Sequence, residues 1–383
     1  MSPHQGAPRI AIGLAGYCAF LNLYAPQAIM PLLAQEFDVD AAGISSVMTA
    51  GTLSVALIAP FAGTVADVIG RKRVITSALL VLVAPTIMIA LTSTLSGMIV
   101  WRFVQGLVLP PIFAIAIAYV GEEWPPKEAA AVAGVYTSGA SLGGFSGRFF
   151  TGILADLFGW RTAFLILAAI TLVLAGAVAV LLPREKRFVR SPGLVASARD
   201  MLQHFRSAPL LATYAIGFGT LFNFIALFTF VSFHLEAPPY GFSATLLGAV
   251  FAVYLAGTVL TPSVGWALMR FGRRPLLSTL LAVWAVGAAL TLARPVSLVI
   301  AGLLLCAAAG LMCQAVSTGI DTITAKRGAS SAVGLYVTSF YVGGSVGAAL
   351  GGVAWTIGGW PACVAMVLAM LTVMAAIVVS VWR

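Results

Sequence analysis

Long apolar runs fill most of the chain and are separated by short breaks that contain charged residues, glycine or proline. The runs reach about 20 residues, the length at which a helix crosses the hydrocarbon core of a bilayer. They show little alternation of period two, which favours helices over the strands of a membrane barrel. We predict twelve transmembrane helices, at about 9–33, 42–66, 72–93, 97–120, 129–154, 160–182, 209–235, 243–268, 275–293, 296–320, 329–354 and 360–381.

The composition indicates that hydrocarbon is the main solvent of the fold. Hydrophobic residues make up 61% of the chain and charged residues 9%, compared with roughly 25% charged residues in soluble domains. The mean hydropathy is +1.04. Because lipid offers no hydrogen-bond partner to the backbone, each spanning segment must satisfy its own amides. We therefore expect an all-α integral membrane protein.

The basic residues are distributed unevenly between the two sides of the predicted membrane. An even number of helices places both termini on one side, and all but four of the 21 lysines and arginines fall there; the exceptions are Arg102, Arg148, Arg161 and Arg294. By the positive-inside rule, that side is the cytoplasm. We expect a bacterial inner membrane protein with cytoplasmic termini, and we attribute the net charge of +9 to its orientation rather than to a nucleic-acid partner.

The second half of the chain repeats the first. Glycine, tyrosine and tryptophan positions recur at a constant shift of 200 residues, in the pairs Gly134/Gly334, Tyr136/Tyr336, Gly143/Gly343, Gly144/Gly344, Gly147/Gly347, Gly152/Gly352, Gly159/Gly359 and Trp160/Trp360. We predict two pseudo-symmetric six-helix bundles, 1–182 and 209–383, joined by a basic cytoplasmic linker at 183–208. Secondary transporters built from such parallel repeats bind their substrate near the midplane between the halves.

A conspicuous motif, GTVADVIGRKR, follows the second predicted helix. Gly63 allows close helix approach, Gly70 permits a tight turn, and Asp67 can pair with Arg71 or Arg73 at the cytoplasmic end of a helix. Such a pair is stronger when its surroundings are closed and dry. We predict that these five residues form a conformational latch.

This motif resembles the signature of the major facilitator superfamily, G-x-x-x-D-x-x-G-R-[KR]-x-[KR], with the last basic position shifted by one residue. The second half keeps Gly265, Gly272 and Arg273 but has Met269 in place of the acid. The resemblance implies a fold of two six-helix bundles and secondary active transport by alternating access. The expected partners are a small-molecule substrate, the lipid bilayer and protons, and we expect a monomer.

Arg102 and Gln105 match the R-x-x-Q-G element of the same family, in the fourth predicted helix. An arginine inside an apolar span is costly and therefore suggests a function and a partner. The resemblance implies a role in conformational or proton coupling. The alternative is that Arg102 donates to backbone carbonyls of a neighbouring helix.

The segment 141–161, SLGGFSGRFFTGILADLFGWR, looks like the bacterial efflux branch described as arabinose-efflux-like permeases. This likeness implies a proton-coupled exporter of a hydrophobic drug or a sugar-like solute. Arg148 lies in this segment with no acid within four residues, so it pairs across helices, lines a wet cavity or meets a substrate. An alternative function is therefore transport of a small organic or inorganic anion recognised by Arg148, Arg102 or both. A more distant alternative is a membrane sensor that transports nothing.

Polar and aromatic residues of the predicted helices are the candidates for the wall of the central cavity. Polar residues of the first and seventh helices lie where the family's cavity-lining helices present them. The full candidate set is Asn22, Tyr24, Gln27, Phe113, Tyr136, Arg148, Phe222, Asn223, Tyr254, Tyr336 and Phe340.

Several classes of function are disfavoured by what the sequence lacks. There is no GxxxxGK[ST] loop for ATP, and the three histidines, His4, His204 and His234, are far apart and without acidic partners, so we do not expect an enzyme. The cysteines lie singly in apolar runs, which predicts neither a disulfide framework nor a metal site. We expect no cofactor. No Asp or Glu lies near the centre of a predicted helix, so the sequence assigns no proton carrier.

Overall fold

The computed structural model describes residues 3–62, 66, 69–186, 207–324 and 329–381, and within them the chain is helical with no strand. Eight of the described helical segments are long and apolar enough to cross a membrane by length and composition. The prediction of an all-α membrane fold is therefore confirmed. The segments 63–65, 67–68 and most of the linker, 187–206, lie outside the described residues.

The first group of helices contains several breaks at proline. Proline lacks an amide hydrogen and cannot continue the hydrogen-bond ladder of a helix. Pro26 lies in a 3-10 turn that follows α1, and Pro110 opens a new helix directly after Leu109. The elements are α1 (Pro3–Tyr24), η1 (Ala25–Ile29), α2 (Met30–Glu36), α3 (Ala41–Ile58), η2 (Ala59–Phe61), α5 (Arg71–Leu91), α6 (Leu95–Val108), α7 (Pro110–Glu123), α8 (Pro126–Phe158) and α9 (Trp160–Leu181).

The second group repeats this arrangement. Its elements are α11 (Ala208–Glu236), α12 (Ala244–Val250), α13 (Val253–Leu260), η3 (Thr261–Ser263), α14 (Val264–Phe271), α15 (Arg273–Leu290), α16 (Val296–Thr324) and α17 (Ala329–Val381). The long α17 is two helices that meet at Gly358 and Gly359. Gly359 has φ +60°, and Gly159, at the same place between α8 and α9, has φ +81°. Only glycine adopts such angles without strain.

The internal repeat is also visible in helix packing. Four glycines of α8 and α17 lie so close to α1 and α11 that a Cβ at any of them would overlap the backbone of the facing helix. The pairs are Gly143–Tyr17, Gly147–Leu21, Gly343–Phe218 and Gly347–Phe222. Small residues are what allow helix backbones to approach this closely in a membrane. The same contact is therefore built twice, once in each half.

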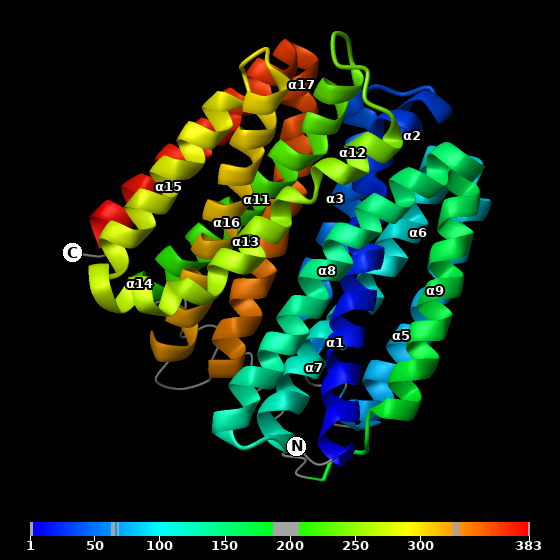
Figure 1. The fold of residues 1–383 in the computed structure, drawn as a ribbon, viewed down its shortest axis with the longest axis vertical. Coiled ribbons are helices and arrows are strands. Elements are labelled where there is room, and N and C mark those ends of the chain that lie inside the picture. The colour runs from blue at the N-terminus through cyan, green and yellow to red at the C-terminus, as the bar shows by residue number, and fades with distance from the viewer. Residues whose placement is uncertain (1–2, 63–65, 67–68, 187–206, 325–328, 382–383) are drawn as a thin grey trace.

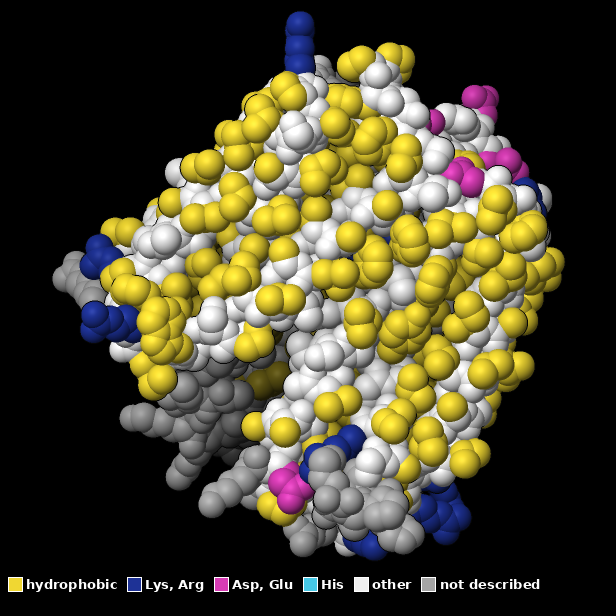
Figure 2. All heavy atoms as spheres, viewed as in Figure 1, with side chains coloured by type: hydrophobic (Ala, Val, Ile, Leu, Met, Phe, Trp, Pro, Cys, Tyr) yellow, Lys and Arg dark blue, Asp and Glu magenta, His cyan; other side chains and the backbone are white. Residues whose placement is uncertain are grey.

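The two groups of helices stand side by side (Figure 1), and we call α1 to α9 the first bundle and α11 to α17 the second bundle. We call one end of the molecule the distal end; it carries the loops at 37–40 and 237–243 and the turn within α17. We call the opposite end, where the N-terminus lies, the proximal end. Apolar side chains cover the middle of the face shown in Figure 2, and charged side chains gather towards its edges. The surface between the bundles is hollowed towards the proximal end.

Candidate substrate site between the two bundles

Arg148 of α8 lies at the boundary between the bundles and is only 3% exposed. Its Nε donates to Gln27 Oε1 at 2.7 Å, and its Nη1 donates to the carbonyl oxygen of Gly144 at 2.7 Å. Gln27, in η1, donates in turn to Thr229 Oγ1 of α11 at 2.9 Å. The break at Pro26 matters here, because it places Gln27 in a 3-10 turn between α1 and α2.

Three aromatic rings surround the Arg148 guanidinium. Its central carbon lies 4.2 Å from the ring centroid of Tyr24, 4.6 Å from that of Phe251 and 4.9 Å from that of Tyr254. Tyr24 belongs to the first bundle, while Phe251 and Tyr254 lie at the junction of α12 and α13 in the second. Cation–π contacts of this kind contribute about 2 kcal/mol or more each when desolvated. Arg148 therefore contacts both bundles through the faces of rings.

No described carboxylate forms an ion pair with Arg148; the described ion pairs involve Arg9, Arg71 and Arg161. The hydrogen bonds of Arg148 to described residues use Nε and Nη1, and none uses Nη2. A buried charge is normally paired, because its desolvation is otherwise uncompensated. The guanidinium thus offers one free donor group and an unbalanced positive charge at the bundle boundary.

Arg102 of α6 has a different environment, inside the first bundle. It is 1% exposed, and it donates to the carbonyl oxygens of Asn22 at 3.2 Å and Leu23 at 2.7 Å, and to Gln105 Oε1. Gln105 donates to Thr86 Oγ1 at 2.9 Å. The Arg102 side chain therefore connects α6 to the C-terminal end of α1. This arrangement is the alternative that the sequence left open, in which Arg102 donates to backbone carbonyls of a neighbouring helix.

The two asparagines expected in the cavity wall lie within their own bundles. Asn22 donates to Thr171 Oγ1 at 2.9 Å and accepts from Thr86 Oγ1 at 3.0 Å. Asn223 donates to Met374 Sδ at 3.5 Å, and its Oδ1 has no partner among the described residues. Both side chains are buried, and neither belongs to the group around Arg148.

The other aromatic candidates form stacked contacts. Phe113 of α7 stacks on Tyr341 of α17, with centroids 5.9 Å apart, and so joins the two bundles. Phe340 lies edge-on to Tyr341 and parallel to Tyr336. Phe222 stacks on Phe218, and Tyr136 packs against Gly16 of α1. Tyr341 and Phe251 were not among the candidates, although Phe251 lies three residues before Tyr254 and Tyr341 directly follows Phe340.

The bundles are joined at the distal end by two equivalent close contacts. A Cβ at Gly152 of α8 would overlap the carbonyl oxygen of Ala244 at the start of α12, and a Cβ at Gly352 of α17 would lie 2.7 Å from the Cα of Ala42 at the start of α3. Each contact joins one bundle to the other. The distal closure therefore follows the same internal symmetry as the packing within each bundle.

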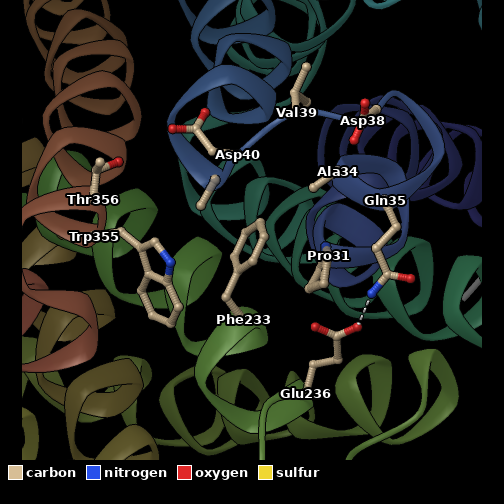
Figure 3. Close-up of a pocket in the computed structure, with 11 residues that line it drawn as sticks. Pro31, Ala34, Gln35, Asp38, Val39, Asp40, Phe233, Glu236, Trp355 and Thr356 are labelled. Carbon is tan, nitrogen blue, oxygen red and sulfur yellow. Dashed lines mark hydrogen bonds between the residues drawn. The ribbon is translucent and has the colours of Figure 1, made fainter.

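Hydrogen bonds strengthen this distal closure. Asp156 Oδ2 accepts from the Thr245 amide at 2.7 Å, and Gln35 donates to Glu236 Oε1 at 2.6 Å. The hydrogen bond between Gln35 and Glu236 lies at an open pocket of about 700 Å³ on the distal surface (Figure 3). Residues of α2, α3, α11 and α17 line this pocket. Glu236 and Gln35 point toward each other at one side of it. The residues that line this pocket do not include Arg148.

The predicted latch is only partly described at the proximal end, because Gly63 and Asp67 lie outside the described residues. Gly70 has φ +99° directly before α5. Arg71 forms a two-pronged contact with Glu122 at 2.8 and 3.2 Å, and Arg73 is exposed. The pairing of Asp67 with an arginine stays a prediction.

Comparison with known proteins identifies the family. The sequence pattern described as Major Facilitator Superfamily matches residues 12–254 and 237–383. The chain belongs to this superfamily. Members of the superfamily are membrane transporters, so this one is a multi-pass membrane transporter and not an enzyme.

Relatives of this superfamily member include bacterial transporters that match most of its length. It is 32% identical over 368 residues to the inner membrane transport protein YnfM of Escherichia coli strain K12, covering 95% of this chain and 88% of that protein. It is 28% identical over 347 residues to an uncharacterized transporter of Buchnera aphidicola subsp. Schizaphis graminum, covering 90% and 84%. Because these matches span nearly the whole chain, both bundles have counterparts in the relatives.

Solved structures share the fold at low identity. A bacterial homologue of the human lysosomal transporter Spinster, in an inward-facing and unoccupied conformation, aligns with a TM-score of 0.71 and 16% identity over 99% of this chain and 95% of that one. The nucleoside transporter NupG aligns with a TM-score of 0.76 and 13% identity over 98% and 100%. At these identities the likeness concerns the fold alone.

Proposed function

We propose that this protein is a secondary active transporter that exports a small organic solute in exchange for protons by alternating access. The observation that carries the proposal is the distal closure, in which Gly152 against Ala244 and Gly352 against Ala42 join the bundles through equivalent contacts. Equivalent contacts on parallel repeats can open together when one bundle rocks against the other. Residues 1–182 and 209–383 are the proposed rocking units, and 183–208 links them.

The proposed substrate site is the group around Arg148, because it lies where the bundles meet and draws residues from both. Gln27 and Tyr24 come from the first bundle, and Tyr254 comes from the second. Rocking of the bundles would change the distances between these side chains. A solute bound there would therefore affect the equilibrium between the two arrangements.

Export and proton coupling are supported by the likeness of 141–161 to efflux permeases and of Arg102 and Gln105 to the family's coupling element. Arg102 joins α6 to α1 through two backbone carbonyls. A movement of α1 would therefore be transmitted to α6. We also propose that the distal end faces the periplasm of a bacterial inner membrane, because the basic residues gather on the other side, and that the protein acts as a monomer.

Solute uptake by the purified protein in proteoliposomes tests this function. A pH gradient is imposed, and the uptake of three labelled solutes is measured. Arabinose represents a sugar, benzoate an organic anion and ethidium a hydrophobic drug. We expect uptake of at least one solute above that of protein-free liposomes, and a protonophore should abolish it. Uptake equal to that of empty liposomes for all three solutes would favour the sensor alternative.

A further inference from the structure

We propose that the substrate is an organic monocarboxylate with an apolar body, and that Arg148 binds its carboxylate. This inference rests on the proposed transport function and selects among the solute classes that the sequence left open. The starting observation is the guanidinium without a counter-ion at the bundle boundary, 3% exposed. A ligand carboxylate supplies the missing negative charge.

The unused donor of Arg148 determines the type of group that it binds. Gln27 and the Gly144 carbonyl occupy Nε and Nη1, so Nη2 remains for a ligand, together with the second hydrogen of Nη1. These two groups form one edge of the planar guanidinium, and that edge matches the two oxygens of a carboxylate. Because neither Gln27 nor the Gly144 carbonyl accepts from Nη2, this edge is the one that a ligand would meet.

The charge of the site limits the ligand to about one negative charge. Arg148 supplies the cation that lies over the rings of Tyr24, Phe251 and Tyr254, and Arg102 is committed to backbone carbonyls inside the first bundle. An inorganic phosphate or a dicarboxylate would carry a second charge for which the described site has no partner, and burial of an unpaired charge is costly.

The aromatic rings around Arg148 indicate what the rest of the ligand is like. Phe251 has no polar group, and the faces of Tyr24 and Tyr254 are turned towards the guanidinium. Around the boundary, Phe113 and Tyr341 add a further stacked pair. Rings bury an apolar body well, whereas a polyhydroxylated body would lose hydrogen bonds to water without replacement.

Ligand-dependent thermal stability of the purified full-length protein in detergent tests the inference, because a ligand that binds the folded state raises the unfolding temperature. The probes are hexanoate, benzoate and phenylacetate, the amide of each acid, gluconate and inorganic phosphate. We expect at least one of the three apolar carboxylates to raise the unfolding temperature with saturation, and we expect its amide, gluconate and phosphate to have no such effect.

Three variants assign the effect to Arg148. In Arg148→Gln, the affinity for the carboxylate ligand should fall roughly 30-fold or more, since one partner of a buried charge pair is removed.

In Gln27→Glu, a carboxylate side chain is placed at the position that lies 2.7 Å from Arg148 Nε. This internal counter-ion should maintain or raise the unfolding temperature without ligand. It should also abolish the response to the carboxylate ligand. The matched control is Arg161→Gln. Arg161 also lies over a ring, that of Trp160 at 4.3 Å, but it already pairs with Glu36. The carboxylate should therefore raise the unfolding temperature of this variant as much as that of the wild type.

Four outcomes would overturn the inference: no response to any apolar carboxylate, an equal response to acid and amide, a stronger response to phosphate or gluconate, or a carboxylate response that persists in Gln27→Glu. The last variant retains Arg148, so it remains informative if Arg148→Gln fails to fold. Binding in detergent and uptake in liposomes are separate measurements. Uptake of another solute without carboxylate binding would refute the inference and leave the transport function intact. Arg148-dependent binding without uptake of any solute would support the carboxylate site and refute the transport function.

Discussion

Thr52 of α3 and Ser345 of α17 share a hydrogen bond across the boundary between the two bundles, with their Oγ atoms 2.8 Å apart. Both side chains are buried. Ser345 also donates to the carbonyl oxygen of Thr49 at 3.2 Å. This pair therefore marks a place where the bundles must separate if the distal end is to open.

A disulfide at this place should stop transport reversibly. In Thr52→Cys/Ser345→Cys the two sulfur atoms would lie where the hydroxyl oxygens meet, and we expect copper phenanthroline to link them. Uptake of the transported solute in proteoliposomes should then be lost and should return with dithiothreitol. Thr52→Cys alone is the control, because the four native cysteines are buried. Full uptake by the cross-linked protein would show that this contact need not open.

The lengths and order of the helices could be predicted from the sequence, because the hydrophobic effect in a bilayer fixes how many apolar residues a span needs. The shift of 200 residues identified Gly143 and Gly343 as equivalent positions, and the structure shows that both lie against the backbone of a facing helix, an approach that a small residue allows. The breaks in the helices were less visible. The first span was expected to be continuous over 9–33, yet it changes to a 3-10 turn at Ala25–Ile29.

Which residues belong to the site was harder to predict. A helix surrounded by lipid and by other helices is apolar on most sides, so its sequence pattern does not show which side faces the site. The sequence grouped Asn22 with Gln27, but Asn22 faces Thr171 within the first bundle and Gln27 faces Arg148. The direction of a side chain around the helix axis decides between these environments, and that direction depends on partners far away in the chain. Phe251 was missed for the same reason.

Removal of Arg102 should destabilise the fold. In Arg102→Met, the carbonyl oxygens of Asn22 and Leu23 lose their donors in a buried environment, which should cost about 2–5 kcal/mol. The free energy of unfolding is measured by titration with SDS in mixed micelles. In the control Arg161→Gln, an exposed ion pair is lost, and the cost should be about 0–1 kcal/mol. Equal stabilities for both variants would refute the structural role of Arg102.

Gly51 provides the space that Arg102 occupies. A Cβ at Gly51 would lie 2.8 Å from Arg102 Nη2, so Gly51→Ala should displace the guanidinium and lower the free energy of unfolding by about 1–3 kcal/mol. Gly176 of α9 is the matched control, because a Cβ there meets nothing within 4 Å. Gly176→Ala should be neutral or stabilising by roughly 0.5–1 kcal/mol. The same SDS titration measures both, and a neutral Gly51→Ala would contradict the packing described.

The central claim is that symmetric contacts at Gly152 and Gly352 hold the distal end closed, and it is tested most directly by distances between nitroxide labels in reconstituted protein. One pair of labels replaces Leu157 and Leu246 at the distal end, and another replaces Ala131 and Met269 at the proximal end; all four positions are exposed.

Pulsed electron paramagnetic resonance should give a short distance between the labels at 157 and 246, the distal distance, in the parent protein. The distance between the labels at 131 and 269 is the proximal distance. Valine at both glycines, Gly152→Val/Gly352→Val, would overlap Ala244 and Ala42, so the account predicts a longer distal distance together with a shorter proximal one. The control Gly134→Val, at a glycine where a Cβ meets nothing within 4 Å, should leave both distances unchanged. Distal and proximal distances that lengthen together, or that do not change in the double variant, would contradict the account.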